Sequence, residues 1–118
     1  MKLVIAIIRP EKLDAVQRAL QLALDEGDNY RITVQTVDGH GRQGGEVEYF
    51  RGQPVRHNLV HKTQVTIGVN DPYVEPAIQA IIVGARTEDG EIGDGKIFVL
   101  PLEECVRIRT GERGGSAI

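Results

Sequence analysis

Runs of apolar and alternating residues predict four β-strands along the chain. Residues 3–8 (LVIAII) form a continuous apolar run of the length expected for a buried strand. Residues 31–37 (RITVQTV) form a second run rich in β-branched residues, and residues 63–69 (TQVTIGV) alternate apolar and polar side chains. Because successive side chains of a strand point to opposite faces, residues 63–69 should present one apolar face. Residues 96–100 (KIFVL) supply the fourth strand.

Two stretches with apolar residues three and four positions apart predict amphipathic helices. The first begins at Pro10, which suits the first turn of a helix, and ends near Gly27. The second opens at Asp71-Pro72, with Gly84 near its end. Pro76 cannot donate a backbone hydrogen bond to residue 72, so we expect a distorted first turn or a start nearer residue 74. The apolar stripes are Leu13, Val16, Leu20 and Ala23 or Leu24 in the first helix, and Val74, Ile78, Ile81 and Ile82 in the second.

The predicted elements follow the order strand, helix, strand, strand, helix, strand. This is the split βαβ pattern of ferredoxin-like α+β domains, in which an antiparallel four-stranded sheet carries both helices on one face. The other face suits either neighbouring subunits or solvent, since its expected residues are polar but uncharged: Thr33, Gln35, Gln64 and Thr66. The connection of about residues 39–60 between the second and third strands is far longer than a hairpin needs, which indicates a functional or mobile loop.

A glycine-rich turn and a basic stretch near the C-terminus suggest a site for an anion. The glycines of GEIGDGKIF (residues 90–98) permit positive φ and let backbone N–H groups approach a ligand. In VRIRTGER (residues 106–113), Arg107 and Arg109 should project to the same side of an extended segment. A nucleotide polyphosphate could then bridge these two arginines with Lys96.

The glycine turn also matches the GxxxxGK spacing of a P-loop, through Gly90, Gly95 and Lys96. However, Ile97 replaces the metal-ligating Ser or Thr, and a strand follows where a P-loop has a helix, so a P-loop is rejected. An ordinary turn beside a solvated basic strand stays open as the alternative to a phosphate site.

Composition excludes several classes of protein. The chain has 118 residues, enough for one domain, and its 17 acidic and 14 basic residues give a net charge of −3. Without Trp and with few other aromatic residues it lacks both the charge and the stacking platforms of a nucleic-acid-binding protein. The single cysteine, Cys105, excludes an internal disulfide framework, and no apolar run resembles a secretory leader or a membrane span, so we expect a cytoplasmic protein. The three histidines lack the additional clustered ligands of a zinc site, and no nucleophile–base arrangement indicates an enzyme.

Three segments resemble those of the PII-type nitrogen-regulatory signal-transduction proteins. They are the start MKLVIAIIRPEKLDAV, the sequence GHGRQGG (residues 39–45) followed by FRG (residues 50–52), and IGDGKIFVLPLEECVRIRTGER (residues 92–113). The segments follow the family's order and spacing over nearly the whole chain, and the last one is long and specific. The resemblance implies a homotrimer of ferredoxin-like subunits. The three clefts between the subunits would bind ATP or ADP and, together with ATP and Mg²⁺, 2-oxoglutarate, so part of each site would come from a neighbouring subunit. The resemblance implies a sensor and not an enzyme.

The resemblance also implies roles for individual residues. Gln43 would coordinate Mg²⁺ together with 2-oxoglutarate, and Lys62 would meet the distal carboxylate of that ligand. A neutral amide oxygen suits such a shell, because the phosphates and the keto acid already supply much negative charge. The adenine and ribose would contact Ile7, Thr33, Gly39 and Gly68. The phosphates would contact Gly41, Arg42, Gly93, Asp94, Gly95, Lys96, Arg107, Ile108 and Arg109.

The long loop of about residues 39–60 would carry the signal to regulated proteins. Recruitment of Gln43 to the metal would reorient the loop, and a ligand shifts such an equilibrium by its differential affinity for the two states. The resemblance implies that Arg51 at the loop tip enters a pore or cleft of a partner, either an ammonium transporter or a metabolic enzyme. A membrane would be reached only through such a partner. The alternatives are a PII-like paralogue that senses nucleotides or another small anion, such as bicarbonate, and a small phosphatase on the same fold.

Several positions depart from the family's pattern. Val55 stands where many members carry a uridylylated tyrosine, and Gln53 stands where some carry a phosphorylated serine, so we expect neither modification. The nucleotide turn covers about residues 86–96, and the C-terminal basic segment that follows it covers about residues 103–113. The turn has an apparent insertion of Glu88-Asp89, and Glu91 replaces a family lysine in it. These carboxylates would weaken ATP binding only modestly, since exposed charges are screened by salt.

Overall fold

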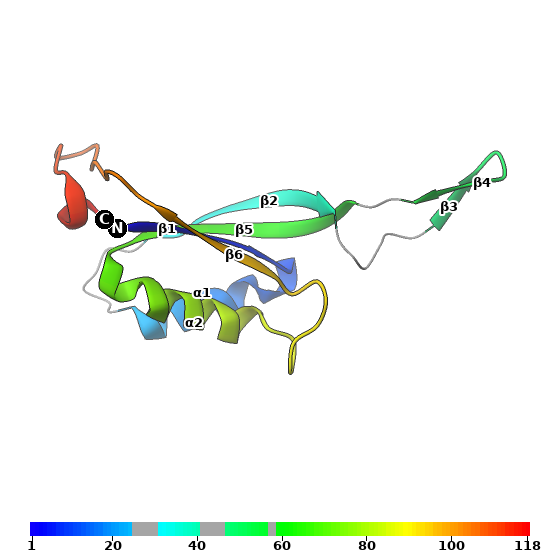
Figure 1. Ribbon diagram of the computed structural model, residues 1–118, viewed down its shortest axis with the longest axis horizontal. Coiled ribbons are helices and arrows are strands. Elements are labelled where there is room, and N and C mark those ends of the chain that lie inside the picture. The colour runs from blue at the N-terminus through cyan, green and yellow to red at the C-terminus, as the bar shows by residue number, and fades with distance from the viewer. Residues whose placement is uncertain (25–30, 41–46, 57–58) are drawn as a thin grey trace.

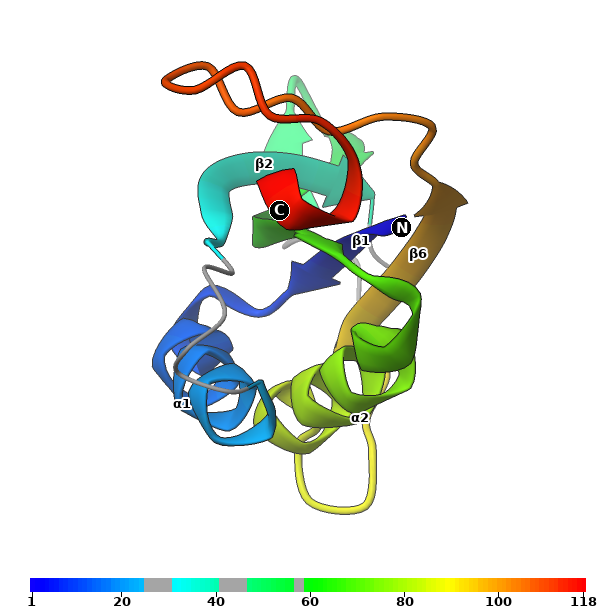
Figure 2. The ribbon, with the colours of Figure 1, turned by 90° about the vertical axis from the view of Figure 1, so that its left-hand side faces the viewer.

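A four-stranded antiparallel sheet with two helices on one face forms the body of the protein (Figures 1 and 2). The computed structural model describes residues 1–24, 31–40, 47–56 and 59–118. The sheet has the strand order β2–β5–β1–β6. Its strands are β1 (Lys2–Ile8), β2 (Thr33–His40), β5 (Leu59–Val69) and β6 (Gly95–Pro101), and the helices are α1 (Leu13–Ala23) and α2 (Val74–Ala85). This arrangement confirms the ferredoxin-like fold; the homotrimer stays a prediction, since one chain is described.

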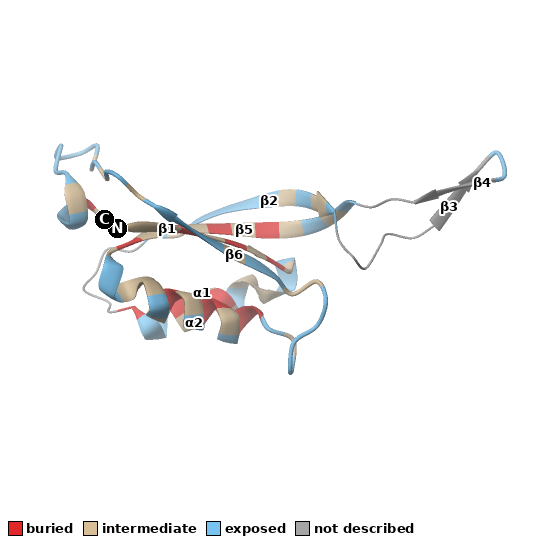
Figure 3. Cartoon of the chain, viewed as in Figure 1, coloured by how far each residue is buried: buried red, intermediate tan, exposed pale blue. Residues whose placement is uncertain are grey.

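The core lies between the sheet and the two helices (Figure 3). Val4, Ala6 and Ile8 alternate along β1 on the face toward the helices, as Val65, Ile67 and Val69 do along β5. From the other side, the predicted apolar stripes contribute the buried residues Val16 and Leu20 of α1 and Ile81 of α2. A 3₁₀ turn over Asp71–Tyr73 precedes α2, which begins at Val74, so the expected consequence of Pro76 is confirmed. The predicted helix end near Gly27 is wrong, because α1 already ends at Ala23 and Leu24 is extended; Gly27 itself lies outside the described residues.

Gly84 has a packing role that its position near the end of a helix did not reveal. A Cβ atom built on Gly84 would lie 2.7 Å from the Cα and 2.8 Å from the N of Val16 in α1. Glycine is therefore needed where the backbones of the two helices approach one another. The helix continues one residue beyond it to Ala85 and ends with Arg86 in an extended conformation.

The two strands that flank the long loop extend further than predicted. β2 continues to His40 and β5 already begins at Leu59, so the ladder runs from the Thr33–Thr66 pair to the His40–Leu59 pair. The extension carries polar, exposed residues such as Asp38 and His61, and it therefore lacked an apolar pattern that could predict it. Its hydrogen bonds come instead from the partner strand.

The long loop contains a short β-hairpin that the sequence did not predict. β3 (Val47–Phe50) pairs antiparallel with β4 (Gln53–Arg56), and Figure 1 shows this hairpin beyond the end of the main sheet. Arg51 and Gly52 form its two-residue turn, with φ of 52° and 78°. Two consecutive positive φ values match the primed turns that fit the twist of a hairpin.

The face of the sheet opposite the helices is more apolar than expected. The polar residues predicted for it do lie there, because Thr33 pairs with Thr66 and Gln35 with Gln64. The register also places Ile5 beside Phe98 and Leu3 beside Leu100 on this face. Phe98 is 50% and Leu100 43% exposed. In the single chain a partly apolar surface is therefore left uncovered, which is typical of a face that packs against another chain.

Candidate functional site

The glycine turn, residues 86–95, joins α2 to β6 at one end of the sheet (Figure 1). Gly90, Gly93 and Gly95 have φ of 107°, 98° and 112°. The predicted positive φ of these three glycines is thus confirmed. Glu88 also adopts a positive φ, 47°, which is uncommon for a residue with a side chain and marks a locally strained backbone.

Gly95 is required by the sheet itself. A Cβ atom built on Gly95 would lie 1.7 Å from the carbonyl oxygen of Ile7 in the neighbouring strand. From the sequence, all three glycines were predicted to let the backbone approach a ligand closely. The structure shows that at Gly95 the closely approaching group is the backbone of β1, whereas a Cβ atom on Gly90 would have no neighbour within 4 Å.

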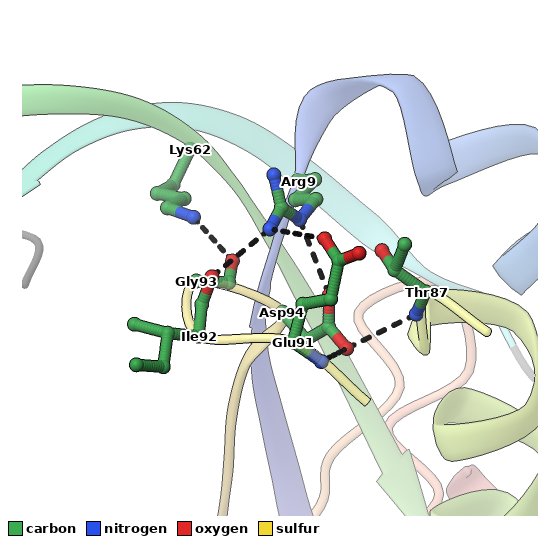
Figure 4. A network of polar contacts seen from close by, with 7 residues as sticks. All are labelled: Arg9, Lys62, Thr87, Glu91, Ile92, Gly93 and Asp94. Atoms are coloured by element: carbon green, nitrogen blue, oxygen red, sulfur yellow. Dashed lines mark hydrogen bonds and ion pairs between the residues drawn. The ribbon is translucent and has the colours of Figure 1, made fainter. Parts of the chain in front are cut away.

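Asp94 organises the glycine turn through both oxygens of its carboxylate (Figure 4). Oδ2 accepts hydrogen bonds from the backbone N–H groups of Thr87 (3.0 Å) and Glu91 (2.9 Å), and Oδ1 accepts one from Nε of Arg9 (3.2 Å). The N–H groups of Glu91 and Thr87 stabilise the ionised form and hold the pKa of Asp94 well below its usual range, while partial burial acts in the opposite direction. Asp94 is therefore a carboxylate whose charge is used within the turn.

Arg9 and Lys62 connect the turn to the sheet (Figure 4). Arg9, directly after β1, also donates from Nη2 to the carbonyl oxygen of Ile92 (3.0 Å), and the same nitrogen lies 3.7 Å from the carboxylate of Glu91. Lys62 of β5 donates from Nζ to the carbonyl oxygen of Gly93 (2.5 Å). Glu91, expected as an additional exposed carboxylate beside the phosphates, is thus exposed but lies beside the guanidinium of Arg9.

The C-terminal basic segment does not have the extended conformation that was predicted. Arg107 and Gly111 form a tight turn in which the N–H of Gly111 donates to the carbonyl of Arg107 (2.7 Å), and Val106 pairs with Arg113. Gly111, with φ of 73°, permits this reversal. The alternation of side chains in an extended strand therefore does not apply to Arg107 and Arg109, and it cannot place them on the same side. The guanidinium of Arg107 instead contacts Glu112 (3.4 Å) and the carbonyl of Ser116 (3.0 Å).

The predicted site residues form two groups at opposite ends of β1. Arg107 and Arg109 line a pocket with Gly68 and Leu3, at the start of that strand. The glycine turn lies at its other end, where Gly95 pairs with Ile8. The seven residues of β1 span about 20 Å, and Figure 1 shows the two groups far apart. The prediction that one polyphosphate bridges Lys96 with Arg107 and Arg109 of the same chain is therefore wrong.

The remaining predicted residues do not gather at one place in the single chain. Ile7 pairs with Lys96 beside the glycine turn, and Gly39 lies near the end of β2, opposite Val60. Thr33, the first residue of the edge strand β2, is opposite Thr66, and Ile108 is fully exposed in the C-terminal turn. Gly41, Arg42 and Gln43 lie outside the described residues, and so do the predictions that rest on them.

Sequence reasoning assigned no role to Arg9, which lies between the first predicted strand and the first predicted helix. The only signal was an arginine directly after a fully apolar strand, where its guanidinium can reach groups at the end of the sheet. The partner could not be identified, since Asp94 is 85 positions away in the chain.

The described residues contain neither a ready cluster of metal ligands nor a membrane span. Among them, no three His, Cys, Asp or Glu side chains are arranged to hold a metal ion. The predicted Mg²⁺ ligand, Gln43, is not one of those residues. Within the described part of the chain, neither helix has the length and apolar character needed to cross a bilayer.

Comparison with known proteins defines the class to which this fold and these two residue groups belong. The family described as "Nitrogen regulatory protein P-II" matches residues 1–112. The chain is 51% identical to nitrogen regulatory protein GlnK1 of Methanosarcina mazei over 118 residues, which are all of this chain and 97% of that protein. It is 48% identical over 118 residues to nitrogen regulatory protein P-II 2 of Methanothermobacter thermautotrophicus, with the same coverage, and to P-II of Azospirillum brasilense, with full coverage of both chains.

The protein is thus a small regulatory protein with a ferredoxin-like fold. It belongs to the nitrogen regulatory protein P-II family. The resemblance found in the sequence is confirmed, and relatives named as regulatory proteins agree with the expectation that the chain is a regulator of nitrogen metabolism.

Proposed function

We propose that the protein is a homotrimeric sensor that binds ATP or ADP and 2-oxoglutarate in clefts between its subunits and regulates nitrogen-metabolism partners through residues 39–60. One observation carries this proposal. The glycine turn and the two C-terminal arginines lie at opposite ends of β1 in one chain, so the same phosphates can meet both groups only when a second chain supplies one of them.

The uncovered face of the sheet supports assembly with other copies. Ile5, Phe98 and Leu100 form an apolar strip on this face, and burial of such a strip between subunits removes it from water. Closed rotational symmetry would repeat the same contact around the oligomer. Each interface would then join the glycine turn of one subunit to Arg107 and Arg109 of the next.

The surroundings of Lys62 support a site for a dicarboxylic effector. Its ammonium group is held at the carbonyl of Gly93, within the same turn that would receive the phosphates. An ammonium has three donors, so Lys62 can keep this contact and still bind a carboxylate. Gln43 would help to hold Mg²⁺, and Lys62 would bind a carboxylate of 2-oxoglutarate. Mg²⁺ would supply positive charge that offsets the phosphates and the keto acid, so binding of 2-oxoglutarate would require nucleotide to be present.

The hairpin of β3 and β4 supports a signalling role for the loop. Arg51 occupies its tip in a left-handed conformation that is costly for a residue with a side chain, and this residue is exposed. An arginine presented in this way suits insertion into a pore or cleft of a partner such as an ammonium transporter or a metabolic enzyme.

Mixed oligomers provide the decisive test of a shared site. Lys96→Ala damages the glycine-turn half, and Arg107→Ala with Arg109→Ala damages the arginine half, so each variant alone should bind ATP much more weakly in calorimetry. In a mixed trimer, one interface joins an intact turn to intact arginines, and ATP binding should return at up to one site per trimer. If co-refolded mixtures bind no better than the separate variants, the shared site is wrong.

The effector is tested by titration of 2-oxoglutarate into the wild type. Binding should require ATP and Mg²⁺ together and should be lost in Gln43→Ala, while ATP binding without 2-oxoglutarate persists. Equal binding of 2-oxoglutarate without ATP and Mg²⁺ would contradict the metal-bridged site. Titration of bicarbonate under the same conditions serves as the control for a different small anion.

A further inference from the structure

We propose that Arg9 and Asp94 form a positioning pair that fixes the backbone of the glycine turn for phosphate binding, and that neither side chain is itself a phosphate ligand. The inference rests on the proposed nucleotide site. It also reassigns Asp94, for which the family resemblance implied a direct contact with the phosphates.

The hydrogen bonds of Asp94 argue against a direct role with an anion. Its carboxylate already accepts two backbone N–H groups, from Thr87 and Glu91, and the Nε–H of Arg9. A carboxylate directed at a phosphate would repel it, whereas one surrounded by three donors has its charge compensated locally. Asp94 therefore acts on a ligand through the shape it gives to residues 87–91.

Arg9 has a matching set of contacts. Its Nε–H donates to Asp94 and its Nη2 donates to the carbonyl of Ile92, so two points of the turn are held by one planar group. The side chain is only 19% exposed. Arg9 follows Ile8, whose partner in the β1–β6 ladder is Gly95. The pair consequently anchors the turn to the end of the sheet, next to the residues that would receive the phosphates.

The same contacts explain how the turn tolerates the apparent insertion of Glu88 and Asp89. Asp94 accepts hydrogen bonds from the N–H groups of Thr87 and Glu91, which directly precede and follow residues 88–90. The N–H of Gly90 donates to the carbonyl of Thr87 (2.7 Å), and residues 88–90 are all exposed. Asp94 thus closes the base of an outward excursion, and the extra residues leave residues 91–95 in place.

Asp94→Asn distinguishes positioning from direct electrostatics, because the two roles predict opposite signs. If Asp94 only adds negative charge near the phosphates, its removal strengthens ADP binding. If Asp94 positions the turn, Asn cannot replace it: its amide oxygen can accept the N–H groups of Thr87 and Glu91, but its NH₂ then faces the Nε–H of Arg9 and cannot accept from it. The anchor to the sheet is lost, and ADP affinity should fall at least about tenfold. An affinity that is unchanged or higher in calorimetry overturns the proposal.

Arg9→Gln and the double variant test the pairing. Arg9→Gln should weaken ADP binding to a similar degree. The double variant should bind ADP little more weakly than either single variant, because either substitution alone already removes the interaction between the two side chains. Additive losses would contradict the pair. Arg18→Gln, at an exposed position of α1, is the matched control and should leave the affinity unchanged. Arg9→Lys keeps the charge but not the planar fork, so it should restore binding only in part; full restoration would contradict the planar-fork role.

Amide hydrogen exchange of the nucleotide-free protein keeps the test independent of ligand identity. Exchange in residues 87–95 should rise in Arg9→Gln and Asp94→Asn while the amides of β1 and α2 stay protected. If the wild type binds no nucleotide, the proposed function fails, and exchange still decides the pairing. Unchanged exchange in this turn overturns the proposal even where nucleotide binds.

Discussion

Replacement of Gly95 by alanine should be among the most damaging single-methyl additions in this protein. Two costs combine at this position. A positive φ of 112° costs a residue with a side chain about 1–3 kcal/mol. The new Cβ atom would also lie 1.7 Å from the carbonyl oxygen of Ile7, half of the 3.4 Å at which ordinary contact begins. Because the obstacle is backbone, β1 and β6 must separate, which adds about 3 kcal/mol or more.

Gly90→Ala is the matched control for this prediction. Gly90 lies in the same turn with a nearly equal φ of 107°, but a Cβ atom there has no neighbour within 4 Å. The two variants therefore share the backbone cost and differ in the clash alone. Urea unfolding at one fixed protein concentration should show Gly95→Ala less stable than Gly90→Ala by at least about 2 kcal/mol. A difference below about 0.5 kcal/mol would refute the steric explanation.

Two further predictions concern the helix packing and the charge of Asp94. Gly84→Ala places a methyl group 2.7 Å from the Cα of Val16. The cost of overpacking, about 1–3 kcal/mol, should exceed the gain in helix propensity of about 1 kcal/mol, so the urea midpoint of unfolding should fall. A higher midpoint would contradict the close contact. Because the pKa of Asp94 is depressed below 3.8, its stabilising contribution is complete above that pH and is lost as the pH falls below it. Between pH 5 and pH 3 the wild type should therefore lose more unfolding free energy than Asp94→Asn, and equal losses would contradict the role of this carboxylate.

The strands and helices that form the core were predictable because their signal is local. The run LVIAII and the alternation of residues 63–69 give the buried faces of β1 and β5, and the three- and four-residue spacing gives both helices. The hairpin of β3 and β4 was not predicted, because its turn is Arg51-Gly52 and its strands have only four residues each. The extension of β2 and β5 was missed for a related reason, since exposed polar residues on paired strands have no apolar period.

The candidate site was predictable in composition but not in arrangement. The glycines, the arginines and Lys62 were identified from residue type and family resemblance. Arg9 was missed, and the C-terminal segment was wrongly predicted as extended, because both depend on contacts outside the local sequence. The sequence also does not tell whether a glycine is needed for the approach of a ligand or for the approach of the protein's own backbone. Only the structure shows that Gly95 accommodates the carbonyl of Ile7.

The sequence by itself determined the order of the elements, the apolar faces that build the core, and the family to which the chain belongs. Only the tertiary structure decided where the chemistry lies. The antiparallel register brings Gly95 to Ile8 and Gly68 to Leu3, and these positions are separated by most of the length of β1. Local periodicity describes which face a side chain occupies but not which end of a sheet it reaches. For this reason the sequence predicted the glycine turn and the two arginines as one half of a shared site, whereas the fold places them at opposite ends of β1.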